Sequence, residues 1–427
     1  MNLVNFSMKI LNSQSLTLLL FIIPLSFIAG IAVTEFFVFF STILFLVINK
    51  DKSLFFDKKI IFLFLFSAYI FTNAYFKIPD DLKLGSIFYF RYVLFSLAIF
   101  YFCKLFDDSK NKKYFFLLIF FLIILIIDSL FQFFYGYNTL GFKITGDRVS
   151  SFFNNELILG SFLVRFMPVI LWFIFFLKID LKKNIISITT FFSLYFITIY
   201  LSGGRTSFFL SLVIILGLFI IIKNLRSILS YSIIILIFFI FITSYFKIGN
   251  ANTFNRIFEK TYNQITKIEI NKSDTKIKKE LKKFNIYSED HEGHILLALH
   301  LFEKNKIFGI GPKGFRHYCR KVNYAPKIGI CSTHPHNILI QIVLELGLIG
   351  LAFYIIAAIF VLFNFFKSIV RHKFNYDYLA FYSITLGLII NLFPFIPGGN
   401  FFNNWISIIL YYNIGLYLYS YKKCILK

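Results

Sequence analysis

Long apolar runs separated by short polar segments fill most of the chain. A run of about 20 apolar residues can cross the hydrocarbon core of a bilayer as a helix, so the pattern predicts an all-α polytopic membrane protein with about twelve transmembrane helices. The expected spans are 15–30, 31–48, 59–76, 86–106, 114–134, 157–178, 184–201, 206–223, 228–246, 337–366, 377–396 and 402–421. The second run follows the first at once, which favours a retained hairpin over a cleaved signal peptide.

The connections between these spans alternate in charge. Lys and Arg are concentrated in one set of short loops, for example 50–59 and 104–113, and in the C-terminal segment. Because short loops rich in Lys and Arg stay on the cytoplasmic side, both termini are predicted to be cytoplasmic.

The longest connection is then expected on the outer side. It divides the chain into spans one to nine in 1–246, a large loop in 247–336, and three spans with a short tail in 337–427. Within the loop, 267–283 is polar and rich in Lys, whereas 291–302 has helical apolar spacing and is expected to pack on the membrane part.

Composition supports the membrane class. Hydrophobic residues make up 58% of the 427 residues, and only 15% are charged. The net charge of +23 would suit a nucleic-acid partner, but Lys and Arg lie between apolar runs, where anchoring at membrane lipids explains them. We therefore expect membrane lipids, and no nucleic acid, as partners.

Five ionisable residues fall inside predicted spans, all towards the outer side: Glu35, Arg91, Asp128, Arg165 and Glu345. Charges inside a membrane are costly and are usually functional or paired. Their one-sided distribution favours chemistry at the outer face over a transport path through the midplane. Arg165 and Glu345 lie at similar depth and are predicted to pair as structural residues near the site, and the same reasoning pairs Arg91 with Asp128.

The most specific signal is the segment 334–350. It begins His-Pro-His-Asn and, after nine intervening residues, continues with Gly347-Leu-Ile-Gly350. This arrangement resembles the signature of the O-antigen ligase family, in which a His, here His336, is followed by Asn, Ser or Gln and then by spaced small residues. Asn337, Gly347 and Gly350 are accordingly expected to be structural residues near the site.

Three further segments resemble the same family. They are the Ser-Gly-Gly-Arg turn of 201–207, the Gly-rich turn of 309–315 and the segment 147–154. The resemblance covers about 145–420 and implies a bacterial inner-membrane enzyme with a large periplasmic loop between helices 9 and 10.

Transfer of a glycan from a lipid diphosphate requires a group that stabilises the diphosphate. Arg205 suits this task, because a guanidinium binds phosphate oxygens through two hydrogen bonds and stays charged. The alternative for Arg205 is an anchor that snorkels to the membrane interface. We assign Arg148 to the same diphosphate site.

The transfer also requires a base for the acceptor hydroxyl, and His336 is the candidate, because imidazole has an unperturbed pKa of about 6.5. The alternative is a histidine that only hydrogen-bonds the loop. The family has a further functional Arg in its large loop, and we expect His291 to replace it as a diphosphate ligand, with Arg256 or Arg316 as alternatives.

Cys319 and Cys331 share the outer loop, where an oxidising compartment permits a disulfide, and we predict one. No metal site is expected, because His291 and His294 are three residues apart, whereas the histidines of a zincin helix are four apart. No cofactor is expected either.

These features predict a metal-independent, inverting O-antigen ligase-like glycosyltransferase of the cell inner membrane, with a periplasmic active site. Its donor would be an undecaprenyl-diphosphate-linked glycan and its acceptor the lipid A core of lipopolysaccharide biosynthesis. A polysaccharide repeat-unit polymerase, with another glycan as acceptor, shares the motifs. A flippase or exporter of the same lipid would need a polar path through the inner half of the bundle, which the sequence does not show. A non-catalytic scaffold would make substitution of His336 silent.

Overall fold

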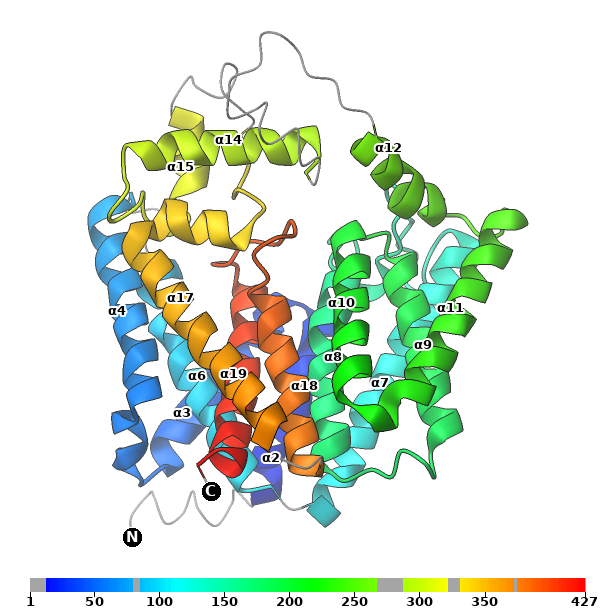
Figure 1. Cartoon of the computed structure of the whole chain (residues 1–427), viewed down its shortest axis with the longest axis horizontal. Helices are drawn as coiled ribbons and strands as arrows, with labels where there is room; N and C mark the ends of the chain where they lie inside the picture. Colours follow the sequence, from blue (N-terminus) through cyan, green and yellow to red (C-terminus); the bar gives the residue numbers. More distant parts are fainter. Residues whose placement is uncertain are drawn as a thin grey trace.

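The computed structural model describes residues 13–79, 85–106, 108–266, 287–321, 331–371 and 375–426. This part of the chain is helical, with two isolated β-bridges and no β-strand. Most helices run side by side in one bundle, and three shorter ones cover the end of the bundle opposite to the C-terminus (Figure 1).

The bundle helices are α2 (Ser13–Ala29), α3 (Ile31–Ile48), α4 (Lys58–Lys77), α6 (Phe90–Lys104), α7 (Asp108–Tyr135), α8 (Leu159–Phe176), α9 (Ile185–Leu201), α10 (Arg205–Ile221), α11 (Arg226–Tyr245), α17 (Ile338–Arg371), α18 (Tyr376–Asn391) and α19 (Asn404–Cys424). The covering helices are α12 (Lys260–Thr266), α14 (Glu289–Glu303) and α15 (Gly314–Lys321). Short 3-10 turns are η1 (Lys52–Phe56), η2 (Ser151–Phe153) and η3 (Lys223–Leu225), and η4 (Asn255–Glu259) is a π-helical turn.

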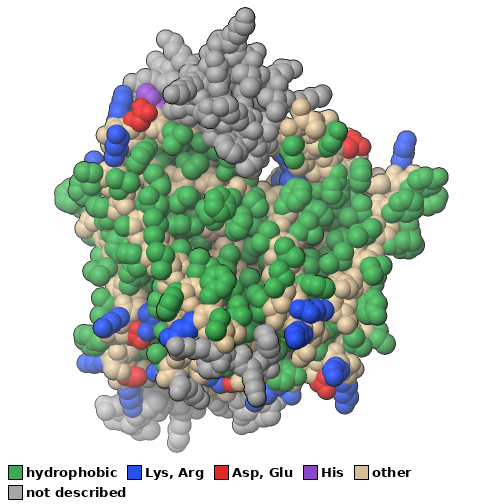
Figure 2. All heavy atoms as spheres, viewed as in Figure 1, with side chains coloured by type: hydrophobic (Ala, Val, Ile, Leu, Met, Phe, Trp, Pro, Cys, Tyr) green, Lys and Arg blue, Asp and Glu red, His purple; other side chains and the backbone are tan. Residues whose placement is uncertain are grey.

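Seven helices of the described segments are long and apolar enough to cross a membrane: α3, α4, α6, α7, α8, α11 and α17. The helices α2, α9 and α10 are apolar but shorter. Large side chains such as Phe39, Phe120 and Phe363 are exposed on this bundle. Hydrophobic side chains cover its middle in Figure 2, and charged ones lie towards its two ends. The all-α polytopic membrane fold is confirmed, and the count of about twelve spans stays a prediction.

Helix α8 is the buried centre of the bundle. Nearly all of its residues are buried, because α9, α10, α18 and α19 pack around it. The contact with α18 is close, since a Cβ added at Gly387 would come 2.9 Å from Cβ of Pro168. An ionisable side chain on α8 is therefore held among other helices and away from lipid.

Helix α17 is interrupted at Gly347, which has φ 67° and ψ −165°. The span expected at 337–366 is corrected accordingly. The first turns, up to Leu346, lie across the end of the bundle, and the remainder runs along it (Figure 1). The peptide groups freed by the break pair with the Gly-rich turn: Ile310 and Gly311 donate to the carbonyls of Leu344 and Glu345 (3.0 and 2.9 Å), and Leu348 and Ile349 donate to those of Lys306 and Ile307 (2.9 and 3.4 Å).

Glycine is required on both segments where the Gly-rich turn packs against the break in α17. A Cβ on Gly347 would lie 2.1 Å from the carbonyl oxygen of Ile307, and one on Gly309 would lie 2.5 Å from the carbonyl carbon of Glu345. The two segments singled out separately in the sequence are thus one interlocked unit.

The predicted pair of Arg91 and Asp128 is wrong. Arg91 on α6 forms its ion pair with Glu35 at 3.1 Å, because α3 packs against α6. Asp128 instead accepts the backbone N–H of Thr139 at 2.9 Å, which fastens the loop after α7.

Candidate functional site

Three arginines gather at the turn between α9 and α10, and we call Arg148, Arg205 and Arg256 the arginine cluster. Gly203 forms the turn with φ 62°, and a Cβ there would come 2.9 Å from the side chain of Arg148 and 3.1 Å from that of Arg256. Both guanidinium groups donate to backbone carbonyls: Arg148 to Ser202 (3.2 Å) and Leu157 (2.6 Å), and Arg256 to Gly203 (2.9 Å) and Gly146 (3.2 Å). These two arginines therefore also hold the loops together.

Arg205 begins α10 and reaches α12, where its Nη1 donates to Oε1 of Gln264 at 2.8 Å. It is only partly buried, so its guanidinium is less enclosed than that of Arg148. Burial, together with the neighbouring Arg256, lowers the pKa of Arg148 to about 10. Arg148 therefore stays cationic at neutral pH, and its burial beside Arg256 has an electrostatic cost that a bound anion would relieve.

Four imidazole rings form a second group, the histidine cluster, made of His291 and His294 on α14 and His334 and His336 before α17. The ring centroid of His336 lies 4.0 Å from that of His334, 5.0 Å from that of His294 and 5.2 Å from that of His291. The structure therefore places His291 beside His336, and Arg256 is the large-loop residue that joins the arginine cluster.

His336 is held by its backbone and its ring. Its φ is 56°, its carbonyl accepts the N–H of Gly398 at 2.7 Å, and its Nε2 lies 3.1 Å from Oγ of Ser332. Burial, together with the neighbouring histidines, lowers its pKa to about 3. The imidazole is neutral at pH 7 and can accept a proton, although it is a weaker base than free imidazole.

Asn337 begins α17. Its Oδ1 accepts the N–H of Ile340 at 3.0 Å, as an N-cap residue does, and its Nδ2 donates to the carbonyl of Pro394 at 2.7 Å. This residue therefore connects the catalytic candidate His336 to the segment that precedes α19. Gly350 also admits no side chain, because a Cβ there would lie 2.2 Å from Cβ of Leu346.

Glu345 is fully buried but does not pair with Arg165. Its carboxylate accepts the backbone N–H groups of Lys313 (3.0 Å) and Phe315 (3.2 Å) and the side-chain amide of Gln341 (2.9 Å). It thus fastens the start of α15 to α17. The predicted pair is wrong because α8 faces α9, α10, α18 and α19, whereas Glu345 faces the Gly-rich turn.

Arg165 has no acidic partner among the described residues. It is 2% exposed, and its Nη1 donates to the carbonyl of Ser161 at 3.3 Å and to the hydroxyl of the same serine. Its Nε has no hydrogen-bond partner. The guanidinium carbon lies 5.7 Å from the centre of the Trp405 ring.

Cys319 and Cys331 are joined by a disulfide, with Cα atoms 5.5 Å apart. Cys319 is buried in a small apolar cluster with Leu297 and Phe315, so the bond ties α15 to the segment that leads to the histidine cluster. In the ranges that the structure describes, no group of three or more His, Cys, Asp or Glu side chains is arranged to hold a metal ion.

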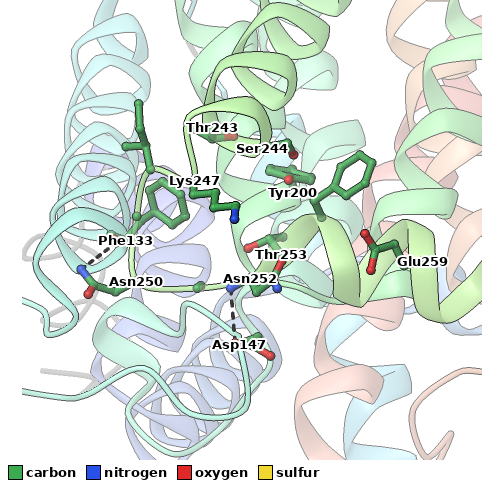
Figure 3. Close-up of a pocket in the computed structure, with 14 residues that line it drawn as sticks. Phe133, Asp147, Tyr200, Thr243, Ser244, Lys247, Asn250, Asn252, Thr253 and Glu259 are labelled. Carbon is green, nitrogen blue, oxygen red and sulfur yellow. Dashed lines mark hydrogen bonds between the residues drawn. The ribbon is translucent and has the colours of Figure 1, made fainter.

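A pocket of about 430 Å³ lies beside the arginine cluster. Figure 3 shows Asp147, Tyr200, Lys247 and Glu259 around it, so its wall combines charged groups with an aromatic ring. Asp147 directly precedes Arg148, and its carboxylate accepts the N–H of Asn252 at 3.3 Å. The pocket and the cluster therefore share one loop.

The predicted catalytic and diphosphate-binding residues fall into two groups at the same end of the bundle. Arg205 is the first residue of α10, and His336 lies just before the start of α17. Both helices start at the end of the bundle that α14 covers (Figure 1). Sequence reasoning did not foresee that four histidines would meet. The sequence shows two pairs of histidines, His291 with His294 at i, i+3 spacing and His334 with His336 at i, i+2 spacing. It does not show that the two pairs contact each other.

Comparison with known proteins identifies one related family. Residues 190–355 match a family model described as O-antigen ligase. This range contains Arg205, Arg256, the four clustered histidines and the interrupted part of α17, and it leaves out Arg148 and Arg165. No curated protein matches the chain significantly.

Proposed function

Since residues 190–355 belong to the O-antigen ligase family, we propose that the protein is a membrane glycosyltransferase that transfers a glycan from undecaprenyl diphosphate to an acceptor hydroxyl. The observation that carries the proposal is the presence, at one end of the bundle, of a cationic turn around Arg205 and a neutral imidazole at His336. The first group can bind a diphosphate and the second can accept a proton, which are the two tasks of the reaction.

The proposed reaction is a single displacement. The acceptor oxygen forms a bond to the anomeric carbon while the bond from that carbon to the diphosphate oxygen breaks. The diphosphate leaves with the electron pair and remains bound to Arg205, with Arg148 and Arg256 at its side. His336 takes the proton of the acceptor hydroxyl, and the anomeric configuration inverts. No step requires a metal or a cofactor.

The pocket that contains Asp147 suits the sugar next to the diphosphate. Carboxylates hydrogen-bond to sugar hydroxyls, and an aromatic ring such as that of Tyr200 supplies an apolar face. Asp147 lines this pocket and directly precedes Arg148, one of the proposed diphosphate ligands, which supports the assignment.

The orientation of the protein in the membrane is part of the proposal. Short loops rich in Lys and Arg would lie in the cytoplasm with both termini, and 247–336 would form a periplasmic loop between helices 9 and 10 of about twelve. A disulfide in this loop supports the outer side, because disulfides persist in oxidising compartments. The membrane would be the bacterial inner membrane, where the donor lipid is used.

We propose lipid A core as the acceptor, which makes the enzyme a ligase of lipopolysaccharide biosynthesis. The cellular phenotype separates this activity from repeat-unit polymerisation. Loss of a ligase leaves full-length polymer on its lipid carrier, whereas loss of a polymerase leaves single repeats.

The biochemical test measures transfer from purified donor lipid by Arg205→Gln and His336→Asn proteins, with folding verified. Asn also adopts positive φ, so His336→Asn removes the imidazole with little change to the backbone. We expect turnover to fall by a factor on the order of 10² or more in each. Arg226→Gln is the control, because Arg226 donates only to carbonyls near the other end of α10. Turnover equal to that of the wild type in both site variants would end the proposal.

A further inference from the structure

Arg165 carries a charge for which the described part of the chain supplies no counter-charge. An ionised group taken out of water costs several kcal/mol unless it is paired. Its contacts are the backbone and hydroxyl of Ser161 and the face of Trp405, and its Nε makes no hydrogen bond. Within a membrane bundle, such a group indicates a functional site, and the missing partner of a guanidinium is an anion.

Contacts of α8 and of Trp405 connect the surroundings of this guanidinium with both clusters. Towards the arginine cluster, a Cβ on Gly160 of α8 would come 3.0 Å from Cβ of Ser202 and 3.1 Å from Cβ of Ser207, the residues that flank Arg205. The start of α8 therefore lies directly against the turn that carries Arg205.

Towards the histidine cluster, the link passes through Trp405. A Cβ on Gly399 would lie 4.0 Å from the indole, and the neighbouring Gly398 donates its N–H to the carbonyl of His336 at 2.7 Å. Arg165, Trp405 and this glycine pair thus connect α8 with the backbone of the proposed base.

We propose that Arg165 is an anion-binding residue that contacts the lipid-side phosphate of the donor diphosphate, between the arginine cluster and the histidine cluster. The position lies six residues into α8, which is about 9 Å below the start of the helix at 1.5 Å per residue. A phosphate on a polyprenyl chain lies at the border of the apolar zone, so it is the phosphate expected deepest in the site. This inference rests on the proposed function, and it adds to the arginine cluster a further phosphate contact, deeper in the bundle.

The test uses the full-length protein in lipid nanodiscs and measures its thermal unfolding and its affinity for undecaprenyl diphosphate without a glycan. The variants are Arg165→Met, which keeps a long side chain without charge, and Arg165→Lys, which keeps the charge without the planar fork. Arg226→Met is the matched control at the other end of the bundle, and Arg205→Met tests the proposed function separately.

We expect Arg165→Met to unfold at the wild-type temperature or above it when no lipid diphosphate is present, because an unpaired buried charge has been removed. We also expect its affinity for undecaprenyl diphosphate to fall at least tenfold, with Arg165→Lys in between and Arg226→Met unchanged. A residue that only supports the fold would give the opposite result, with a lower unfolding temperature and wild-type affinity, and this would overturn the inference.

Two further outcomes separate the inference from the proposed function. Weaker binding by Arg205→Met alone would refute the role of Arg165 and leave the transferase proposal standing, whereas no binding by the wild type would refute both. A parallel titration with phosphorylated lipid A identifies the source of the phosphate. Loss of affinity for lipid A alone would overturn the assignment to the donor.

Discussion

Replacing Gly347 with Ala should detach the Gly-rich turn from α17. The backbone angles of Gly347, φ 67° and ψ −165°, lie in a region that is essentially restricted to glycine, and another residue there costs about 1–3 kcal/mol. The new Cβ would also lie 2.1 Å from the carbonyl oxygen of Ile307, so the two segments must separate. Separation weakens four backbone hydrogen bonds, each with a net value of about 1 kcal/mol.

Together these terms reach at least about 3 kcal/mol, which corresponds to roughly 100-fold more frequent local opening. Amide hydrogen exchange followed by mass spectrometry measures it on peptides that contain 306–311 and 345–350. The control is Gly217→Ala in α10, where the nearest atom to the new Cβ is the flexible end of Leu386 at 3.1 Å, and exchange of these peptides should not change. Unaltered exchange in the Gly347→Ala protein would refute the interlocked arrangement.

Three other changes have outcomes that the structure predicts. The pKa of His336 is about 3 in the folded protein and about 6.5 in an unfolded chain, so between these pH values the unfolded chain binds more protons. The free energy of unfolding should therefore fall as the pH drops below 6.5, by at most about 1.4 kcal/mol per pH unit. The unfolding temperature of the His336→Asn protein should depend less on acid than that of the wild type. Tyr69→Phe removes the 2.6 Å hydrogen bond to the carbonyl of Leu346 and should lower stability by about 1 kcal/mol, and an unchanged unfolding temperature would contradict this contact. Reduction of the disulfide, or Cys331→Ser, should lower the free energy of unfolding by about 3 kcal/mol, because the unfolded chain gains entropy. The unfolding temperature should fall in both cases, and adding reductant to the serine variant should not lower it further.

The sequence predicted the elements of the bundle because membrane helices are long apolar runs. It also identified the helix of the large loop, since 291–302 falls within α14. The interruption of α17 was not predicted, because Leu346 and Leu348 on either side of Gly347 continue the apolar run, and one glycine in such a run is common in membrane helices. Only the backbone pairing with 306–311 shows why the glycine is there.

Pairing of charges could not be predicted in the same way. An apolar run gives the depth of a residue along its helix but not which helices are neighbours. Arg91 and Asp128 have matching depths, yet α6 adjoins α3, so Arg91 meets Glu35. The predicted pair of Arg165 and Glu345 is wrong for the same reason. Because the two residues lie apart, the charge of Arg165 has no acidic partner among the described residues, and our inference about Arg165 depends on this.

The disulfide provides a natural reporter of sidedness. Cys103 and Cys424 are not disulfide-bonded and are both buried, and Cys319 is buried as well, whereas Cys331 is only partly buried; after mild reduction a bulky thiol reagent should therefore react first with Cys331. A reagent that cannot cross the bilayer would label Cys331 in intact spheroplasts only if the loop faces outwards. The orientation of the whole chain can therefore be determined on the unmodified protein, without fusion tags or introduced cysteines.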